Sequence, residues 1–296
     1  NQWGEIEYSN VPSLCMDKNH NAFRRHDTER FHKYLSDVRE GKAKINVGVL
    51  TPARAIKNLS VGNPKLAIEQ WKALDRTMVK RPLIPIVDTS GSMVTDAGEG
   101  CTCMDVANSL GILLSECNPT PFKDLVITFS NNPTTLDLSD CGDIVEKIHR
   151  LMSGDWGMNT NIEATLRLVL TLAKKSLPKG TTLPDLVIFS DMEFDLASRG
   201  QYVHGVMELM QKEFEEEGFK MPKVVFWNLS SNGRAVVPLT QNDNGILLMS
   251  GYSQRLFRML EGDETPEEAV LSEIMDSYWD DMEKLWRKPK DLTSEK

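Results

Sequence analysis

The sequence has little cysteine, no long apolar run and no excess of positive charge. Five cysteines in 296 residues are an odd and sparse set, so we expect no disulfide framework and an intracellular, cytoplasmic location. No window of about 18 consecutive apolar residues occurs, so we expect neither a transmembrane helix nor a membrane partner. The formal charge of -9 argues against a protein that binds nucleic acid or anionic membranes over its whole surface.

The sequence signatures of common catalytic loops are also missing. Gly-x-Ser-x-Gly, His-Glu-x-x-His and Walker A sequences do not occur. The Asp-Thr-Ser-Gly string at 88–91 differs from the aspartic-protease loop, and Ser90 stands where a haloacid-dehalogenase-type phosphatase needs a second Asp. Asp155 and Glu193 could act as a base on metal-bound water, but we expect them either to tune the charge of a site or to be solvated. We therefore expect no enzyme.

The charge is distributed unevenly along the chain. Residues 13–57 carry ten Lys/Arg against five Asp/Glu, and residues 58–296 carry 24 against 36, which predicts two units with different surroundings. Apolar spacing predicts helices over 21–39, after Thr51-Pro52, and over 64–79. Residues 1–79 are therefore expected to be a helical segment, the end of a larger helical-repeat domain in a longer protein that begins before Asn1.

After Pro82, short apolar runs alternate with helical periodicity. Strands are predicted at 83–87, 125–129, 134–138, 186–189, 224–227 and 245–249, and helices at 104–116, 142–152, 161–175, 202–217 and 253–261. The turn Ser-Asn-Asn-Pro after the second strand predicts an antiparallel hairpin. Over residues 80–262 this order predicts an α/β class, a doubly wound, mostly parallel sheet with one antiparallel edge hairpin. Residues 263–296 are expected to be a docked C-terminal helix and tail.

One short motif combines residues that can bind a metal. Asp88, Ser90 and Ser92 follow the first strand at a spacing of two, so one carboxylate and two hydroxyls can turn toward one point. Thr160 opens a later helix and Asp191 ends a later strand, and loops at the carboxyl ends of neighbouring parallel strands converge. These five oxygen donors suit Mg²⁺, or Mn²⁺ or Ca²⁺. The alternative is an ordinary loop whose Asp and Ser residues cap the next helix.

Asp88-x-Ser90-x-Ser92, then Thr160, then Asp191, resembles the complete metal-ion-dependent adhesion site of a von Willebrand factor A (vWA) domain. The match in order, spacing and strand context extends over the predicted sheet domain. The resemblance implies that the two serines bind the ion directly, while the other three residues bind it directly or through water. It implies a non-enzymatic, Mg²⁺-dependent binding module for scaffolding or assembly, in which an open metal position takes an Asp or Glu carboxylate of a protein partner.

The flanking sequence is similar to the Ro ribonucleoprotein family, in which a ring of helical repeats precedes a vWA domain, and to its relatives in plants, fungi and large DNA viruses. The stretches that resemble those relatives are 11–13, 26–31, 42–46, 155–161 and 189–195. The resemblance implies an alternative function, the C-terminal part of a Ro-like protein that binds structured RNA. Its expected RNA contacts are Arg24, Arg25, Arg30, Lys33, Lys42 and Lys44. The simpler interpretation of these basic residues is a solvated helix face.

The loop at 95–103 is longer than this resemblance leads us to expect. It contains two glycines and the sequence Cys101-x-Cys103. Two thiols without further Cys or His at finger spacing make a poor zinc site, so we expect free cysteines. The loop follows the predicted metal ligands directly and could alter or cover their site.

Overall fold

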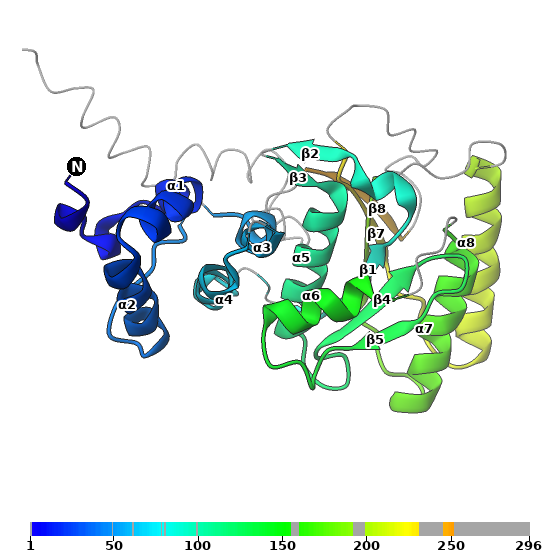
Figure 1. The fold of residues 1–296 in the computed structure, drawn as a ribbon. Coiled ribbons are helices and arrows are strands. Elements are labelled where there is room, and N and C mark those ends of the chain that lie inside the picture. The colour runs from blue at the N-terminus through cyan, green and yellow to red at the C-terminus, as the bar shows by residue number, and fades with distance from the viewer. Residues whose placement is uncertain are drawn as a thin grey trace, which may run out of the picture. The chain divides into compact units, whose positions relative to one another are not determined.

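The computed structural model describes residues 2–48, 50–60, 62–77, 79, 81–98, 100–154, 160–191, 199–230 and 245–251. Residues 1–254 belong to one compact unit, in which Figure 1 shows a helical segment and a sheet covered by helices. The predicted helix at 253–261 and the C-terminal helix and tail at 263–296 lie outside the described residues. Within these ranges no helix is both long and apolar enough for a membrane span.

The helical segment consists of short helices around a small aromatic core. The helices are α1 (Ser13–His26), α2 (Thr28–Arg39), α3 (Pro52–Ser60) and α4 (Pro64–Ala73). Tyr8, from a short 3-10 helix, has its ring centroid 5.2 Å from that of Phe31 and 5.4 Å from that of Tyr34. All three side chains are buried, and aromatic rings at such distances stabilise a core beyond the area that they bury.

The prediction of one helix over 21–39 was wrong, because two helices meet at Asp27. This residue leaves the helical region, with φ -144° and ψ 49°. Its carboxylate accepts hydrogen bonds from Tyr8 Oη at 2.8 Å and from Arg30 Nη1 at 3.0 Å. Such bonds between side chains favour a bend at Asp27, and the one from Tyr8 is a tertiary contact that helical periodicity does not reveal.

The helix predicted over 64–79 was too long, because α4 ends at Ala73. Leu74 is extended, with φ -60° and ψ 141°. Arg76 then turns back and donates to the carbonyl oxygens of Trp71 at 3.2 Å and Leu74 at 2.9 Å. Its guanidinium thereby adds a second hydrogen bond to the Trp71 carbonyl oxygen, which also accepts the Leu74 N–H at 3.2 Å, and binds the Leu74 carbonyl oxygen just after the helix.

The main sheet has the strand order β5-β4-β1-β6-β7-β8. Its strands are β1 (Leu83–Asp88), β4 (Leu125–Phe129), β5 (Thr135–Asp137), β6 (Asp185–Ser190), β7 (Val224–Asn228) and β8 (Ile246–Ser250). β5 is antiparallel to β4, and the other neighbouring pairs are parallel. The predicted α/β fold with a doubly wound, mostly parallel sheet and one antiparallel edge hairpin is therefore confirmed.

Helices cover both faces of this sheet, as Figure 1 shows. They are α5 (Cys103–Cys117) on one face and α7 (Ile162–Ser176) and α8 (Arg199–Glu216) on the other, with α6 (Ile144–Met152) beside α5. Along β1, Ile84 and Ile86 join the core beneath α7 and α8. Val87 faces α5, where a Cβ added at Gly111 would lie 2.5 Å from Val87 Cγ2. Because side chains alternate along a strand, Asp88 continues the face of Ile84 and Ile86.

The long loop after the Asp-x-Ser-x-Ser motif folds into a small hairpin. Its strands are β2 (Asp96–Gly98) and β3 (Cys101–Thr102), which pair antiparallel and contact α3 and α5. The Thr102 side chain accepts from Asp105 N, and the Asp105 side chain accepts from Thr102 N. This capping box starts α5 directly after the hairpin.

Candidate metal centre

Asp88 is the last residue of β1, and its carboxylate is held from two sides. The backbone N–H of Ser90 donates to Oδ1 at 2.8 Å, and the Ser190 hydroxyl donates to Oδ2 at 2.5 Å. The parallel register pairs Val87 with Phe189, so Asp88 and Ser190 are the next residues on the two central strands. Asp88 is only 1% exposed, and these bonds fix its orientation at the carboxyl edge of the sheet.

The two serines of the motif lie side by side. Ser90 Oγ and Ser92 Oγ are 3.0 Å apart, because a 3-10 helix at Gly91–Val94 follows Ser90 and bends the chain back. Met93 is buried, and its Sδ accepts the backbone N–H of Asp191 at 3.2 Å. The loop after β1 is therefore joined to the residue that follows β6.

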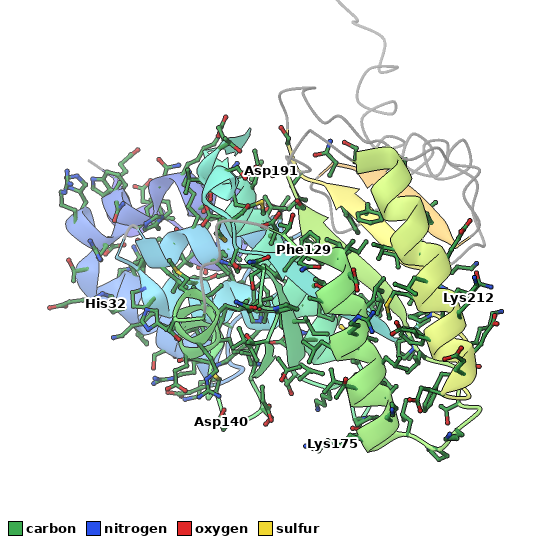
Figure 2. All side chains as sticks on the ribbon, turned by 90° about the vertical axis from the view of Figure 1, so that its right-hand side faces the viewer. His32, Phe129, Asp140, Lys175, Asp191 and Lys212 are labelled. Atoms are coloured by element: carbon green, nitrogen blue, oxygen red, sulfur yellow. The ribbon has the colours of Figure 1, made fainter. Side chains whose placement is uncertain are left out.

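Asp191 brings a second carboxylate to this edge. It is 2% exposed, and Figure 2 shows it at the end of its strand. The pKa of Asp88 is raised to about 6, chiefly by burial and to a smaller extent by the charge of Asp191, while hydrogen bonds from Ser190 and Ser90 act in the opposite direction. Two acidic side chains therefore share a buried site at a free-energy cost that a cation would reduce.

Thr160 lies at the same end of the sheet but is not joined to the other predicted ligands. It is half-buried and directly precedes Asn161, the N-cap of α7. Figure 2 shows Lys175, near the other end of α7, at the opposite end of the sheet from Asp191. Within the described residues Thr160 forms no hydrogen bond with the other four, so the structure brings together Asp88, Ser90, Ser92 and Asp191.

The donor set of this centre fits a hard divalent cation. It consists of carboxylate and hydroxyl oxygens, which Mg²⁺ and Ca²⁺ prefer over thiol or imidazole ligands. Within the described ranges no group of three or more His, Cys, Asp or Glu side chains is placed to hold a metal. The centre at Asp88 has only two carboxylates and would rely on hydroxyl groups for the remaining ligands.

Two residues of this centre, Ser190 and Met93, are absent from the ligands that the sequence predicts. Strand alternation could have indicated Ser190, because it lies two residues after Ile188, which packs in the same core cluster as Ile86. Nothing in the local sequence indicates that the Met93 sulfur accepts a hydrogen bond from Asp191.

The hairpin beside the centre holds buried thiols. Cys101 and Cys103 are buried, and all five cysteines are free in the structure. Cys103 Sγ lies 3.4 Å from Thr95 Oγ1 and 3.4 Å from the carbonyl oxygen of Leu229. Burial raises the pKa of the Cys103 thiol, so it stays protonated and serves packing.

The basic residues expected to contact RNA do not form one set. Arg24 donates to the carbonyl oxygen of Gly62 at 2.9 Å. Arg30 donates to the carbonyl oxygens of Trp3 and Ile6 at 3.0 and 2.7 Å. Lys42 pairs with Glu40 at 2.5 Å, whereas Arg25, Lys33 and Lys44 are exposed. Arg24 and Arg30 therefore hold the helical segment together, whereas the Lys42–Glu40 pair is exposed and local.

The parallel sheet, the Asp-x-Ser-x-Ser loop at the end of its central strand and the helices on both faces form a vWA-like fold. The chain belongs to the family described as Domain of unknown function (DUF7788), whose model matches residues 83–294. A second family model, Domain of unknown function (DUF2828), matches residues 1–82.

Individual proteins are also similar to this chain. Uncharacterized protein L728 of Acanthamoeba polyphaga mimivirus is 30% identical over 298 residues, which cover 94% of this chain and 51% of that protein. The chain therefore spans about half the length of the curated relative that it matches.

Two solved structures are similar in fold. The Ro (RSR) protein of Deinococcus radiodurans matches with a TM-score of 0.52 and 13% identity, over 82% of this chain and 51% of that one. The vWA domain of SpRpn10 matches with a TM-score of 0.38 and 13% identity, over 62% of this chain and 94% of that one. At 13% identity the similarity to the Ro protein concerns the fold alone. The TM-score of 0.38 for the SpRpn10 domain is too low to support a conclusion.

Proposed function

We propose that the chain is a non-enzymatic, vWA-type binding module that holds Mg²⁺ and captures an acidic protein partner in scaffolding or assembly. The proposed ligands are Asp88, Ser90, Ser92, Thr160 and Asp191. The observation that carries the proposal is the buried Asp88 carboxylate, whose raised pKa reflects burial and the nearby charge of Asp191. The two serine hydroxyls beside it, 3.0 Å apart, add neutral oxygen donors to this acidic pair.

The surrounding residues are suited to hold these donors in place. Ser190 and the Ser90 backbone each donate one hydrogen bond to a different oxygen of Asp88, and each carboxylate oxygen keeps capacity for a further interaction. The Met93 sulfur fixes the backbone of Asp191. A bound Mg²⁺ would supply an open position for a carboxylate of the partner.

The edge of the site also offers an apolar contact. Val94 lies two residues after Ser92 and is 67% exposed. A partner that presents an Asp or Glu side chain to the centre would meet Val94 beside it. An acidic group flanked by an apolar residue is therefore the recognition element that we propose for the partner.

Calorimetric titration of Mg²⁺ tests the metal site. Asp88→Ala and Ser92→Ala should lower the affinity at least tenfold, whereas the control Glu208→Ala, which removes one charge from the exposed face of α8, should leave it unchanged. Circular dichroism would show that each variant keeps its fold. Equal affinity of folded Asp88→Ala and the wild type would refute the assignment.

A second candidate is RNA binding by a longer Ro-like protein. The fold similarity to a Ro protein over 82% of this chain and the basic composition of 13–57 support it. The contacts of Arg24, Arg30 and Lys42 within the protein argue against it, because these side chains already have partners. A pull-down from cell lysate with wild type and Asp88→Ala separates the two candidates. RNA retained by both proteins favours the second, and a protein partner lost with EDTA or with the variant favours the first.

A further inference from the structure

A cavity of about 440 Å³ lies between α2 and α4 and reaches Gly142 and Asp143, which precede α6. Its volume falls in the range of small-molecule sites in proteins. Figure 2 shows His32, one of its lining residues, on the helical segment and far from Asp191 at the metal centre. The cavity is therefore separate from the site of the proposed function.

The two helices line this cavity with the same spacing. The lining residues are His32, Leu35, Ser36 and Arg39 from α2, and Lys65, Ile68, Glu69 and Lys72 from α4. Positions i, i+3, i+4 and i+7 form one continuous face of a helix. Each face has an aliphatic residue at its second position and a basic residue or histidine at both ends. The cavity thus combines an apolar middle with ends that carry Arg39, Lys65 and Lys72 and, at one of them, the His32 ring.

The two acidic residues of the lining are engaged within the protein. Glu69, whose side chain is 8% exposed, pairs with Lys72 at 3.4 Å. Asp143 Oδ1 accepts the backbone N–H groups of Val145 at 2.8 Å and Glu146 at 3.1 Å and so caps α6. In the described residues, neither carboxylate forms an ion pair with His32, Arg39 or Lys65.

Three basic side chains of the lining are available to bind a ligand. In the part of the chain that the structure describes, His32, Arg39 and Lys65 form no ion pair with a carboxylate. Arg39 makes only a long hydrogen bond to Ser36 Oγ, at 3.4 Å. A planar guanidinium and an ammonium are the usual partners of phosphate. The cavity therefore presents positive charge that no lining carboxylate pairs with, and the acidic interaction of Arg39 is a Coulombic one with the exposed Glu40.

We propose that this cavity binds a phosphorylated small molecule of about mononucleotide size. Its phosphate meets the cationic side chains of Arg39 and Lys65, with His32 nearby. Its ring lies on the aliphatic side chains of Leu35 and Ile68 in the middle of the cavity. A free inorganic anion would use only the first of these two contacts.

Titration of AMP in EDTA, followed by calorimetry, tests this site with a defined ligand and without a metal. Arg39→Gln/Lys65→Gln should weaken binding at least tenfold. The matched control Lys18→Gln/Lys212→Gln removes the same charge from exposed positions outside the lining and should bind as the wild type does. Adenosine and inorganic phosphate should each bind more weakly than AMP.

A second variant, Ile68→Trp, keeps every charge and fills the cavity, so it should also lose AMP. Asp88→Ala should bind AMP normally. The proposal is overturned if the wild type does not bind AMP, if the Arg39/Lys65 variant binds as the control does, or if adenosine binds as tightly as AMP. Loss of AMP with a folded Asp88→Ala protein alone would show that binding depends on the other site and would also overturn the proposal.

Discussion

The indole N–H of Trp71 in α4 donates to the Glu116 carboxylate at the end of α5, with 3.1 Å between Nε1 and Oε1. Arg76 donates to the other oxygen at 2.8 Å, and Lys147 pairs with the first at 3.0 Å. Glu116 is thus shared by the regions that match the two family models, residues 1–82 and 83–294. One half-buried carboxylate connects the helical segment to the sheet domain.

Glu116→Gln should lower the free energy of unfolding by about 2 kcal/mol, because it removes the charged partner of Arg76 and one of the two carboxylate partners of the buried Lys147, which keeps Asp124 at 2.7 Å. Urea denaturation followed by circular dichroism measures this change. Glu208→Gln, on the exposed face of α8, is the control and should change stability by less than about 0.5 kcal/mol. Equal effects of the two substitutions would show that the Glu116 contacts contribute no net stability.

Gly111→Ala should destabilise the protein by about 1–3 kcal/mol. The added Cβ would lie 2.5 Å from Val87 Cγ2, so α5 must move away from β1. Gly205→Ala is the matched control, because Gly205 lies in α8 with nothing within 4 Å of an added Cβ. That substitution should raise stability by roughly 0.5–1 kcal/mol. Thermal unfolding of both variants compares them, and a stabilised Gly111→Ala protein would contradict the close packing.

The stability of the metal-free protein should depend on pH through Asp88. Its pKa is raised from 3.8 to about 6 in the folded state, so the folded protein takes up a proton more readily than the unfolded chain. The carboxyl group therefore favours folding below pH 3.8, and this contribution is lost as the pH rises through about 6. The difference corresponds to ~3 kcal/mol at neutral pH.

Urea unfolding in EDTA between pH 4 and pH 7.5 measures this dependence. The wild type should lose more stability over this range than Asp88→Asn, which cannot ionise at that position. Saturating Mg²⁺ at pH 7.5 should restore the stability of the wild type. Parallel pH curves for the two proteins would show that the pKa of Asp88 is not raised.

Ser190→Ala should weaken Mg²⁺ binding about five- to tenfold, less than Asp88→Ala does. The Ser190 hydroxyl orients Oδ2 of Asp88 through a bond of 2.5 Å. A hydrogen bond to a charged group contributes about 1.5 kcal/mol, and only part of this is lost from Mg²⁺ binding because the bond is also present without the metal. Ser109→Ala removes another buried hydroxyl, which donates to the Val106 carbonyl oxygen within α5, and should leave Mg²⁺ affinity unchanged. Calorimetry on both variants would reveal a purely structural role for Ser190 if their affinities agree.

Much of the fold follows from local patterns. The strand predicted at 125–129 coincides with β4, and the one at 83–87 is a residue shorter than β1. Short apolar runs bounded by turn residues are typical of buried strands, so the local sequence is sufficient to predict them. The helix predicted over 142–152 begins instead at Ile144, since Asp143 caps it. The ends of α1 and α4 depend on Tyr8 and Arg76, whose contacts local periodicity does not contain.

The sequence by itself determined the α/β class and the three-residue motif of Asp88, Ser90 and Ser92, because both rest on spacing within a few residues of the chain. Only the tertiary structure decided that Ser190 holds Asp88 and that Met93 holds Asp191. It also placed the matching faces of α2 and α4 around one cavity. These relationships depend on strand register and helix packing, which bring together residues that lie far apart in the sequence and are set by the burial of the whole core.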